Sequence, residues 1–249
     1  MKKIAVLSSI LALTLLSGVV YADNNWYVEL DGGYRLNTID KTADSFIQAG
    51  QSEPDTYTPS SVSNSGVAGF GFGYRFYTGT TTWFTHDDVG LRYQYISPAT
   101  IDGTVNVASQ EGADNFDYNY SLTQNTVFVT DKLALVKLGA FIPYIQLGAG
   151  PSINQVSQYS ETAKKDIYVR DAAFAANNYL KFGYMGRVGV DINLSPQWKL
   201  NVAYEYDSPS DVQTGLGSSD APDEYLTNTV SNNEVTIGFQ YLFGIKSFN

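Results

Sequence analysis

The stretch Trp26-Tyr27-Val28-Glu29-Leu30-Asp31-Gly32-Gly33-Tyr34-Arg35 decides the fold of this chain. Every second residue in it, starting from Trp26, is apolar, aromatic or glycine, while Glu29, Asp31 and Arg35 lie between them. Successive side chains of a β-strand point to opposite faces, so this alternation gives one apolar and one polar face. The same pattern returns at residues 68–76, 89–95, 182–194, 198–206 and 235–243. Long alternating strands rich in aromatic residues predict a transmembrane β-barrel with lipid outside and a polar lumen inside.

The first 22 residues have the form of a secretory signal peptide. Lys2 and Lys3 form a short positive region, residues 4–20 are mostly apolar, and Val20-Tyr21-Ala22 has the small-x-small pattern of a cleavage site. A retained membrane anchor is the alternative, which the short apolar run disfavours. We therefore expect a signal peptide at residues 1–22 and a single outer-membrane β-barrel domain at residues 23–249.

Composition excludes several classes of function. The chain of 249 residues has no cysteine and a formal net charge of −10. The lack of cysteine excludes disulfides, thiol chemistry and cysteine-based zinc sites. Loss of Lys2 and Lys3 with the signal peptide changes the charge from −10 to −12, which argues against nucleic acid as a partner. A mean hydropathy of −0.17 is compatible with a barrel, because alternation averages the apolar surface away in a hydropathy window.

The alternating pattern divides the chain into eight expected strands, whose connections alternate between short and long. The strands are expected at residues 25–36, 66–77, 88–97, 118–137, 143–153, 179–194, 197–207 and 233–243. Short turns are expected at residues 78–87, 138–142 and 195–196, and long loops at residues 37–65, 98–117, 154–178 and 208–232. We therefore predict an all-β fold, an eight-stranded antiparallel transmembrane β-barrel with short periplasmic turns and four long surface loops.

Two segments depart from this regular plan. Asp131-Lys132 interrupts the alternation of the fourth strand, which predicts a bulge or a membrane exit nearby. Residues 163–176 in the third loop have mixed charge, and they fit either a short helix or an extended segment. The sequence leaves both alternatives open.

Aromatic residues mark the expected membrane boundaries. Trp26 starts the first strand, Trp83 lies in the first short turn and Trp198 follows the third, so all three map to the periplasmic rim. Tryptophan and tyrosine gather at membrane interfaces, where an amphipathic ring is half hydrated. The opposite, cell-surface girdle is expected to contain Tyr34, Tyr95, Tyr118, Tyr120, Tyr179 and Tyr206.

The polar set of the alternation is expected to line the lumen. It contains Glu29, Asp31, Arg35, Arg75, Arg92, Gln94, Arg187, Asp191, Lys199 and Glu205. Both signs of charge are present, and charges in a narrow interior need partners, so we expect a paired charge network. An eight-stranded barrel is only just wide enough for side chains to fill it, which favours a filled lumen. A narrow ion or solute channel with a charged constriction is the alternative.

The chain resembles the eight-stranded outer-membrane barrels of the OmpA/OmpX-like and opacity-protein-like porin families. The resemblance covers nearly the whole mature chain and rests on strand patterns at residues 25–28, 69–74, 143–150, 200–206 and 235–243. Such families often end on an aromatic residue that the barrel-assembly machinery reads, and the resemblance implies Phe243 or Phe248 as this assembly signal. It also implies outer-membrane lipid and lipopolysaccharide as surroundings.

The sequence offers little support for catalysis. His86 is the single histidine, and the pattern places it in the first short turn beside Asp87 and Asp88, facing the periplasm. Barrel enzymes usually use a histidine paired with serine or aspartate near the surface rim, so this histidine predicts an ordinary solvated turn. Glycines at positions 66, 69, 71 and 73 lack the following helix of a phosphate-binding loop. We expect no enzymatic activity, no cofactor and no metal site.

Acidic residues gather in the second and fourth expected loops, which contain no lysine or arginine. They are Asp102, Glu111, Asp114 and Asp117, and Asp211, Asp220, Asp223 and Glu224. Three interpretations are open: a solvated surface, loose divalent-cation binding, or recognition of a basic partner on a host or neighbouring cell. We expect a non-enzymatic outer-membrane surface protein that supports envelope integrity and loop-mediated surface interaction or adhesion. A narrow porin-like channel for ions or small solutes is the alternative.

Overall fold

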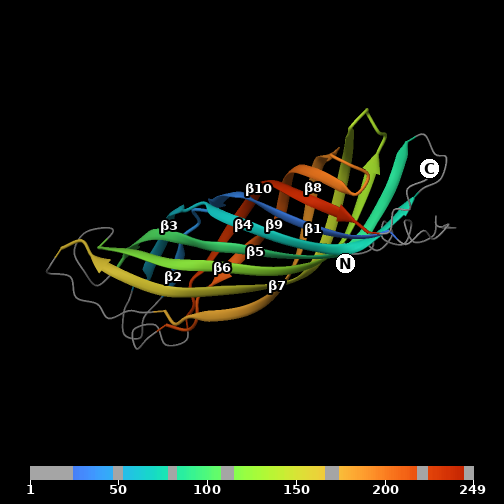
Figure 1. Cartoon of the computed structure of the whole chain (residues 1–249). Coiled ribbons are helices and arrows are strands. Elements are labelled where there is room, and N and C mark those ends of the chain that lie inside the picture. The colour runs from blue at the N-terminus through green and yellow to red at the C-terminus, as the bar shows by residue number, and fades with distance from the viewer. Residues whose placement is uncertain are drawn as a thin grey trace, which may run out of the picture.

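A computed structural model describes residues 25–46, 53–77, 83–107, 115–165, 174–217 and 224–243 (Figure 1). The signal-peptide prediction and Phe248 lie outside these residues, as does most of the segment with the predicted helix. Ten strands are present in the described part: β1 Trp26–Ile39, β2 Asp44–Phe46, β3 Asp55–Val62, β4 Ser65–Tyr77, β5 Phe84–Asn106, β6 Phe116–Leu135, β7 Phe141–Ala163, β8 Asn177–Asn193, β9 Trp198–Gln213 and β10 Thr227–Leu242. Among the described residues, no helix is long and apolar enough to cross a membrane.

Eight of the ten strands close into a ring. The order is β1–β4–β5–β6–β7–β8–β9–β10, and β10 pairs back to β1, with every pairing antiparallel. The prediction of an eight-stranded antiparallel barrel is therefore confirmed for the ring. The remaining strands, β2 and β3, lie within the expected first loop, where β3 pairs with the upper part of β5 beyond the end of β4.

The outer wall of the ring is apolar in its lower part. Each ring strand exposes a large apolar side chain there, in chain order Leu30, Phe70, Leu91, Val129, Leu147, Val188, Val202 and Ile237. A soluble barrel would bury such residues, whereas a membrane-spanning barrel presents them to lipid. We refer to this zone as the lipid belt, and it places the barrel in an outer membrane.

The strands extend far beyond the lipid belt, and the polarity of the two faces is inverted there. In β6, Val127 and Val129 point outward within the belt, whereas Asn119 and Ser121 point outward above it. The inward residues above the belt are apolar instead, with Leu122 3% exposed. Odd-numbered and even-numbered residues of β6 stay on the same two faces along the whole strand. The two zones therefore differ only in which of the two sets of residues is apolar.

This inversion corrects two sequence-based expectations. The long loops begin later than expected, because β5, β6 and β7 run for 23, 20 and 23 residues. Figure 1 shows these long strands continuing to the left, past the ends of β1 and β4. Tyr118 and Tyr120 do not belong to the outer girdle, since each is only 1% exposed and points inward. Tyr118, Tyr120 and Lys132 all occupy even-numbered positions of β6, and all three are buried. The alternation of β6 is unbroken between them, so all three side chains point inward.

An apolar core fills the ring above the lipid belt. Its buried members are Tyr57, Ile101, Val105, Val107, Phe116, Tyr118, Tyr120, Leu122, Val156, Phe174, Val212, Leu226 and Val230. The rings of Tyr118 and Tyr120 stack at 6.2 Å, and Tyr57 meets Phe174 edge-on at 5.6 Å. Burial of each large apolar side chain stabilises by about 1.5–3 kcal/mol, so this upper barrel has the core of a soluble domain.

The strand irregularities lie in β5 and not in β6 at the dipeptide that suggested one. Asp131 and Lys132 themselves sit in a continuous β5–β6 ladder, with Asp131 on the outside and Lys132 inside, and the nearby irregularity lies in the partner strand β5, opposite Ala134 and Leu135. The alternation continues because Lys132 finds a buried partner, Asp191, at 2.8 Å. Register shifts in β5 instead fall between Phe84 and His86 and between Ile96 and Ala99.

The wall has a seam between β8 and β9. Their backbone ladder ends at Met185 and Asp207, although both strands continue above it. A β9 bulge before Ser210 and the missing N–H of Pro209 explain why pairing stops there. Side chains replace the ladder: Tyr179 Oη donates to the Asp211 carbonyl at 2.9 Å and accepts from Gln213 N at 3.1 Å.

Candidate functional site: the charged lumen

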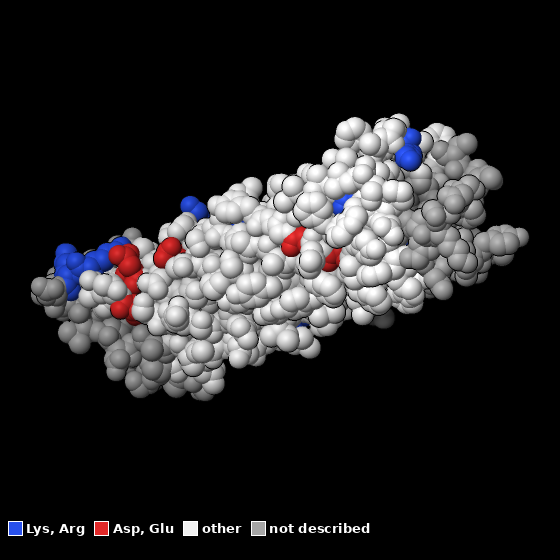
Figure 2. Space-filling model, viewed as in Figure 1, with Lys and Arg blue, Asp and Glu red and all other residues white. Residues whose placement is uncertain are grey.

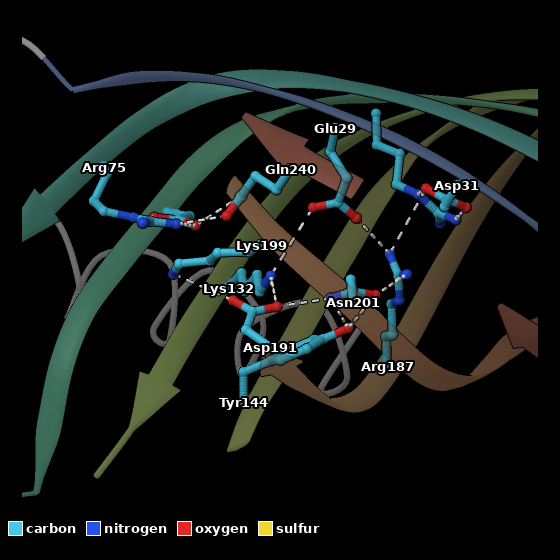
Figure 3. A network of polar contacts seen from close by, with 12 residues as sticks. Glu29, Asp31, Arg75, Lys132, Tyr144, Arg187, Asp191, Lys199, Asn201 and Gln240 are labelled. Atoms are coloured by element: carbon cyan, nitrogen blue, oxygen red, sulfur yellow. Dashed lines mark hydrogen bonds and ion pairs between the residues drawn. The ribbon is translucent and has the colours of Figure 1, made fainter. Parts of the chain in front are cut away.

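The structure brings the predicted lumen residues together inside the lipid belt (Figure 3). All are buried, and the arginines at positions 35, 75, 92 and 187 are at most 2% exposed. They come from both halves of the chain, because the ring sets β4 opposite β8 and β5 opposite β9. The residues form three linked groups along the barrel axis, a central, a lower and an upper one.

The central group joins opposite walls. Arg92 in β5 donates to Asp31 Oδ1 at 2.8 Å and to both oxygens of Glu205 at 2.8 and 2.9 Å. Arg187 in β8 donates to Glu29 Oε1 at 3.1 Å and lies 3.7 Å from Glu205. Two guanidinium groups are thus surrounded by three carboxylates, so each buried charge has an opposite partner.

The lower group lies toward the ends of β1 and β10. Arg75 makes a two-pronged contact with Asp88, at 2.6 Å for each bond, and also donates to Gln240 at 2.7 Å. Asp191 accepts from Lys132 at 2.8 Å and lies 3.5 Å from Lys199 Nζ. Figure 3 shows both lysines converging on this carboxylate from different strands.

Tyr144 and Asn201 add neutral polar side chains to the network beside Lys132. The amide of Asn201 donates to Tyr144 Oη at 2.8 Å and to Asp191 at 2.8 Å, while its oxygen accepts from Arg187 at 2.8 Å. Lys132 Nζ also lies 4.1 Å above the ring centre of Tyr144. These neutral groups connect the lower and central groups into one network.

His86 belongs to the lumen rather than to a solvated turn. It lies within β5 and is 3% exposed, because β5 begins before the expected boundary. Lys199 Nζ donates to His86 Nε2 at 3.1 Å, which leaves the proton on Nδ1, and Nδ1 then donates to Thr85 Oγ1 at 2.9 Å. With its Nδ1 protonated, this histidine does not accept a proton from the Thr85 hydroxyl.

The upper group contains more carboxylates than cations. Arg35 lies 2.8 Å from Asp207 and 3.1 Å from Glu234, and it also donates to Gln124 at 2.7 Å. Gln94 donates to Glu234 at 2.7 Å and to Glu205 at 3.1 Å. Over the whole network seven carboxylates meet six cationic side chains, and the upper group contributes two of these carboxylates, Asp207 and Glu234, and one cation, Arg35.

Glu205, Asp207 and Glu234 also lie close enough together to hold a cation between their oxygens. Arg35 and Arg92 already occupy this position with their guanidinium groups, which repel a metal ion. We therefore assign no metal to this group of carboxylates.

Sequence reasoning omitted several members of the network. They are Asp88, Lys132, Tyr144, Asn201, Asp207, Glu234 and Gln240. Parity alone would have found most of them. In residues 233–243, for example, the outward set is odd-numbered, so Glu234 and Gln240 had to point inward. Lys132 was hidden because the dipeptide Asp131-Lys132 looked like a break in the strand.

The residues predicted to form the two girdles have different contacts, and three of the six predicted tyrosines lie exposed on the outer wall. Trp26 stacks on Phe72 at 5.1 Å, and Trp198 packs on Tyr241 at 4.8 Å, while Trp83 is 76% exposed. At the other rim, Tyr34, Tyr95 and Tyr206 are exposed on the outer wall, whereas the Tyr179 hydroxyl lies in the seam. Phe243, a predicted assembly signal, donates its backbone N–H to the Trp26 carbonyl at 2.8 Å.

The comparisons with solved structures find barrels at low sequence identity. The outer membrane protein OprG from Pseudomonas aeruginosa is 16% identical, with a TM-score of 0.46, over 91% of this chain and 100% of OprG. The outer membrane protein AlkL, studied in lipid bilayers, is 13% identical, with a TM-score of 0.41 over 93% of this chain and 96% of AlkL. Neisserial surface protein A is 11% identical, with a TM-score of 0.37 over 87% of this chain and 96% of that protein. No protein family matches the sequence, and no curated protein is similar to it.

Proposed function

We propose that this outer-membrane β-barrel is a non-enzymatic surface protein that supports envelope integrity and carries an interaction surface on its upper barrel. The observation that carries the proposal is the cross-lumen charge network. Arg92 joins β5 to β9 through Glu205, and Arg187 joins β8 to β1 through Glu29. Because these bonds cross from wall to wall, the interior acts as a cross-brace that stiffens the barrel as a membrane anchor.

The alternative function is a narrow channel. It requires a water-filled path past the network, yet the lumen side chains that support bracing are almost completely buried, with Glu205 and Asp191 at 0% exposure. A planar-bilayer recording of the folded protein separates the two functions. We expect no discrete conductance steps, and steps whose size changes in Arg92→Ala would establish the channel instead.

The contacts of His86, the single histidine of the chain, support a non-enzymatic role. His86 is held in the tautomer that donates to Thr85, and its other nitrogen accepts from Lys199, so the pair lacks a general base. We expect His86→Asn to keep the surface phenotype of cells that produce the protein. A phenotype lost in this variant, with the barrel still folded, would argue for catalysis.

The upper barrel supports the interaction part of the proposal. Its apolar core holds β2, β3 and the upper parts of β5, β6 and β7 in a fixed arrangement above the membrane. Loops that are positioned by a rigid scaffold are a common place for recognition. A binding screen on host cells or neighbouring bacteria, with the full chain and with versions shortened at the loops beyond β5, β7 and β9, tests it. Adhesion is rejected if the shortened versions bind as well as the full chain.

A further inference from the structure

We infer that the outer face of the upper barrel on β5, β6 and β7 packs against the uncharged sugars of the lipopolysaccharide that surrounds it. This face consists of the outward residues at 100–106 in β5, 117–125 in β6 and 155–162 in β7, and we refer to it as the hydroxyl face. The inference goes beyond the proposed function, because it concerns the wall that faces neighbouring lipids instead of the loops that face the medium.

The hydroxyl face is continuous with the lipid belt. Outward residues follow one another every second position, which is about 7 Å along a strand. In β6, Val127 is the last apolar outward residue, and Asn125, Thr123 and Ser121 follow directly above it. The face therefore begins within one step of the hydrocarbon boundary and rises through the zone of the lipid headgroups. In the outer leaflet of an outer membrane these headgroups are oligosaccharides.

The chemistry of the hydroxyl face fits neutral sugars. Its outward residues are serine, threonine, asparagine and glutamine, with two aspartates and no lysine or arginine. Asp117 is paired with Lys164 at 3.2 Å, and Asp102 accepts from Ser61 at 3.3 Å. Surfaces that face water usually contain about 25–35% charged residues, and this one contains far fewer. Figure 2 shows charged side chains gathered toward the left end of this view, at the top of β6 and β7, where the face ends.

The scarcity of cations, which are confined to Lys164 on Asp117 at the upper edge, decides which part of the lipopolysaccharide is contacted. Phosphate groups are bound mainly by arginine and lysine, because charge-assisted hydrogen bonds are about twice as strong as neutral ones. Hydroxyl and amide side chains instead match sugar hydroxyls, which donate and accept in the same way. The predicted contact is therefore with uncharged core sugars and not with lipid A phosphates.

The face is also held rigid from behind. Between Asn119, Ser121 and Thr123 on the outside, Tyr120 and Leu122 are buried in the apolar core. Tyr93 Oη donates to Asn125 at 2.6 Å at the lower edge, and Ser160 donates to Asn119 at 3.2 Å higher up. Side chains fixed in this way lose little entropy on binding, which favours many weak hydrogen bonds acting together.

The test uses the natural lack of cysteine in the chain. Full-length Thr123→Cys protein is reconstituted in vesicles that contain either lipid A alone or lipopolysaccharide with a complete core, and the rate of maleimide labelling is measured. We expect labelling to be at least about fivefold slower with complete core, which corresponds to the roughly 1 kcal/mol of one net hydrogen bond. Equal labelling rates in the two kinds of vesicle would overturn the inference.

Two matched variants separate specific packing from crowding. S121E/S157E places a glutamate pair beside Thr123, and T38E/S231E places the same pair on the β1–β10 wall, in each case at directly paired positions. We expect the first pair to restore fast labelling at position 123 and the second to leave it slow. If neither pair restores labelling, the sugars act by crowding, and if both do, the effect is general charge repulsion. Either result contradicts specific packing, and heat-modifiable gel mobility confirms folding of each variant.

Discussion

Arg92 and Glu205 face each other across the lumen, and Arg92 Nη1 donates to both carboxylate oxygens of Glu205 at 2.8 and 2.9 Å. Their strands, β5 and β9, are not neighbours in the ring, so no backbone ladder connects them. Backbone pairing joins only adjacent strands, so it is this ion pair that fixes the distance between the two opposite walls. Its burial makes it costly to break, because an unpartnered charge in this interior has no water to replace its partner.

The first prediction concerns this pair. Arg92→Met leaves Glu205 and Asp31 without their main partner, and we expect it to lower the free energy of unfolding by about 3–5 kcal/mol. Urea titration in detergent, followed by heat-modifiable gel mobility, measures the loss. Lys181→Met is the control, since the Lys181–Asp211 pair is exposed and should contribute less than about 1 kcal/mol. A similar loss for both variants would contradict a cross-lumen brace.

The second prediction follows from the surplus carboxylate of the upper group. Glu234→Gln removes one charge where Arg35 serves two carboxylates, and the new amide oxygen still accepts from Gln94. We expect this variant to be as stable as the parent chain or more stable. Arg35→Gln should instead cost about 3–5 kcal/mol, because it strands both Asp207 and Glu234. Urea unfolding of the two variants measures this difference, and a loss in Glu234→Gln as large as in Arg35→Gln would show that the charges are balanced.

The sequence was sufficient for the lower barrel and insufficient for the upper one. In residues 26–35 the apolar parity faces lipid, and the same rule located all eight ring strands. Above the belt the apolar residues of the alternation face inward. Tyr118 and Tyr120 are therefore buried in the core, although the same alternation predicted them on the outer wall. Periodicity identifies which residues share a face, but only the surroundings decide whether that face meets lipid, water or core.

The charge network divides in the same way. Glu29, Asp31 and Arg92 could be assigned to the lumen from parity, but their pairing could not, because it depends on how the ring closes. Closure sets β5 opposite β9, and the sequence gives no direct measure of that distance. His86 was misplaced for a smaller reason, which is that β5 already starts at Phe84, with a register shift between Phe84 and His86.

The third prediction tests the apolar core of the upper barrel. Leu122→Ala should destabilise this region by about 2–5 kcal/mol, because it leaves a cavity among buried residues. Ser121→Ala on the adjacent outward position should change stability by less than about 0.5 kcal/mol. Amide hydrogen exchange measures the effect by region. We expect faster exchange in the strand segments above the belt and unchanged exchange below it, whereas uniform acceleration would mean that the two zones unfold together.

The fourth prediction concerns pH at the seam. The hydrogen bond from Lys181 holds the pKa of Asp211 below its ordinary value. A carboxyl group with a lowered folded pKa contributes stability above its unfolded pKa of about 3.9 and loses it as pH falls through the folded value. We expect the seam to open more often below the folded pKa of Asp211. Amide hydrogen exchange at residues 208–213, corrected for its intrinsic pH dependence, measures this opening. Asp211→Asn should remove this dependence, and an unchanged profile would assign it to another group.

The fifth prediction concerns the hydroxyl group of Tyr179, which replaces the missing ladder. Tyr179→Phe leaves the Gln213 N–H and the Asp211 carbonyl without this partner, at a cost of about 0.5–1.5 kcal/mol for each lost hydrogen bond. We expect faster exchange of the Gln213 amide and of its neighbours in β9, with the β9–β10 ladder unaffected. Tyr206→Phe provides the matched control, because its ring lies on the exposed outer wall below the seam. If both variants leave the Gln213 amide equally protected, the seam is held by packing and not by the tyrosine hydroxyl.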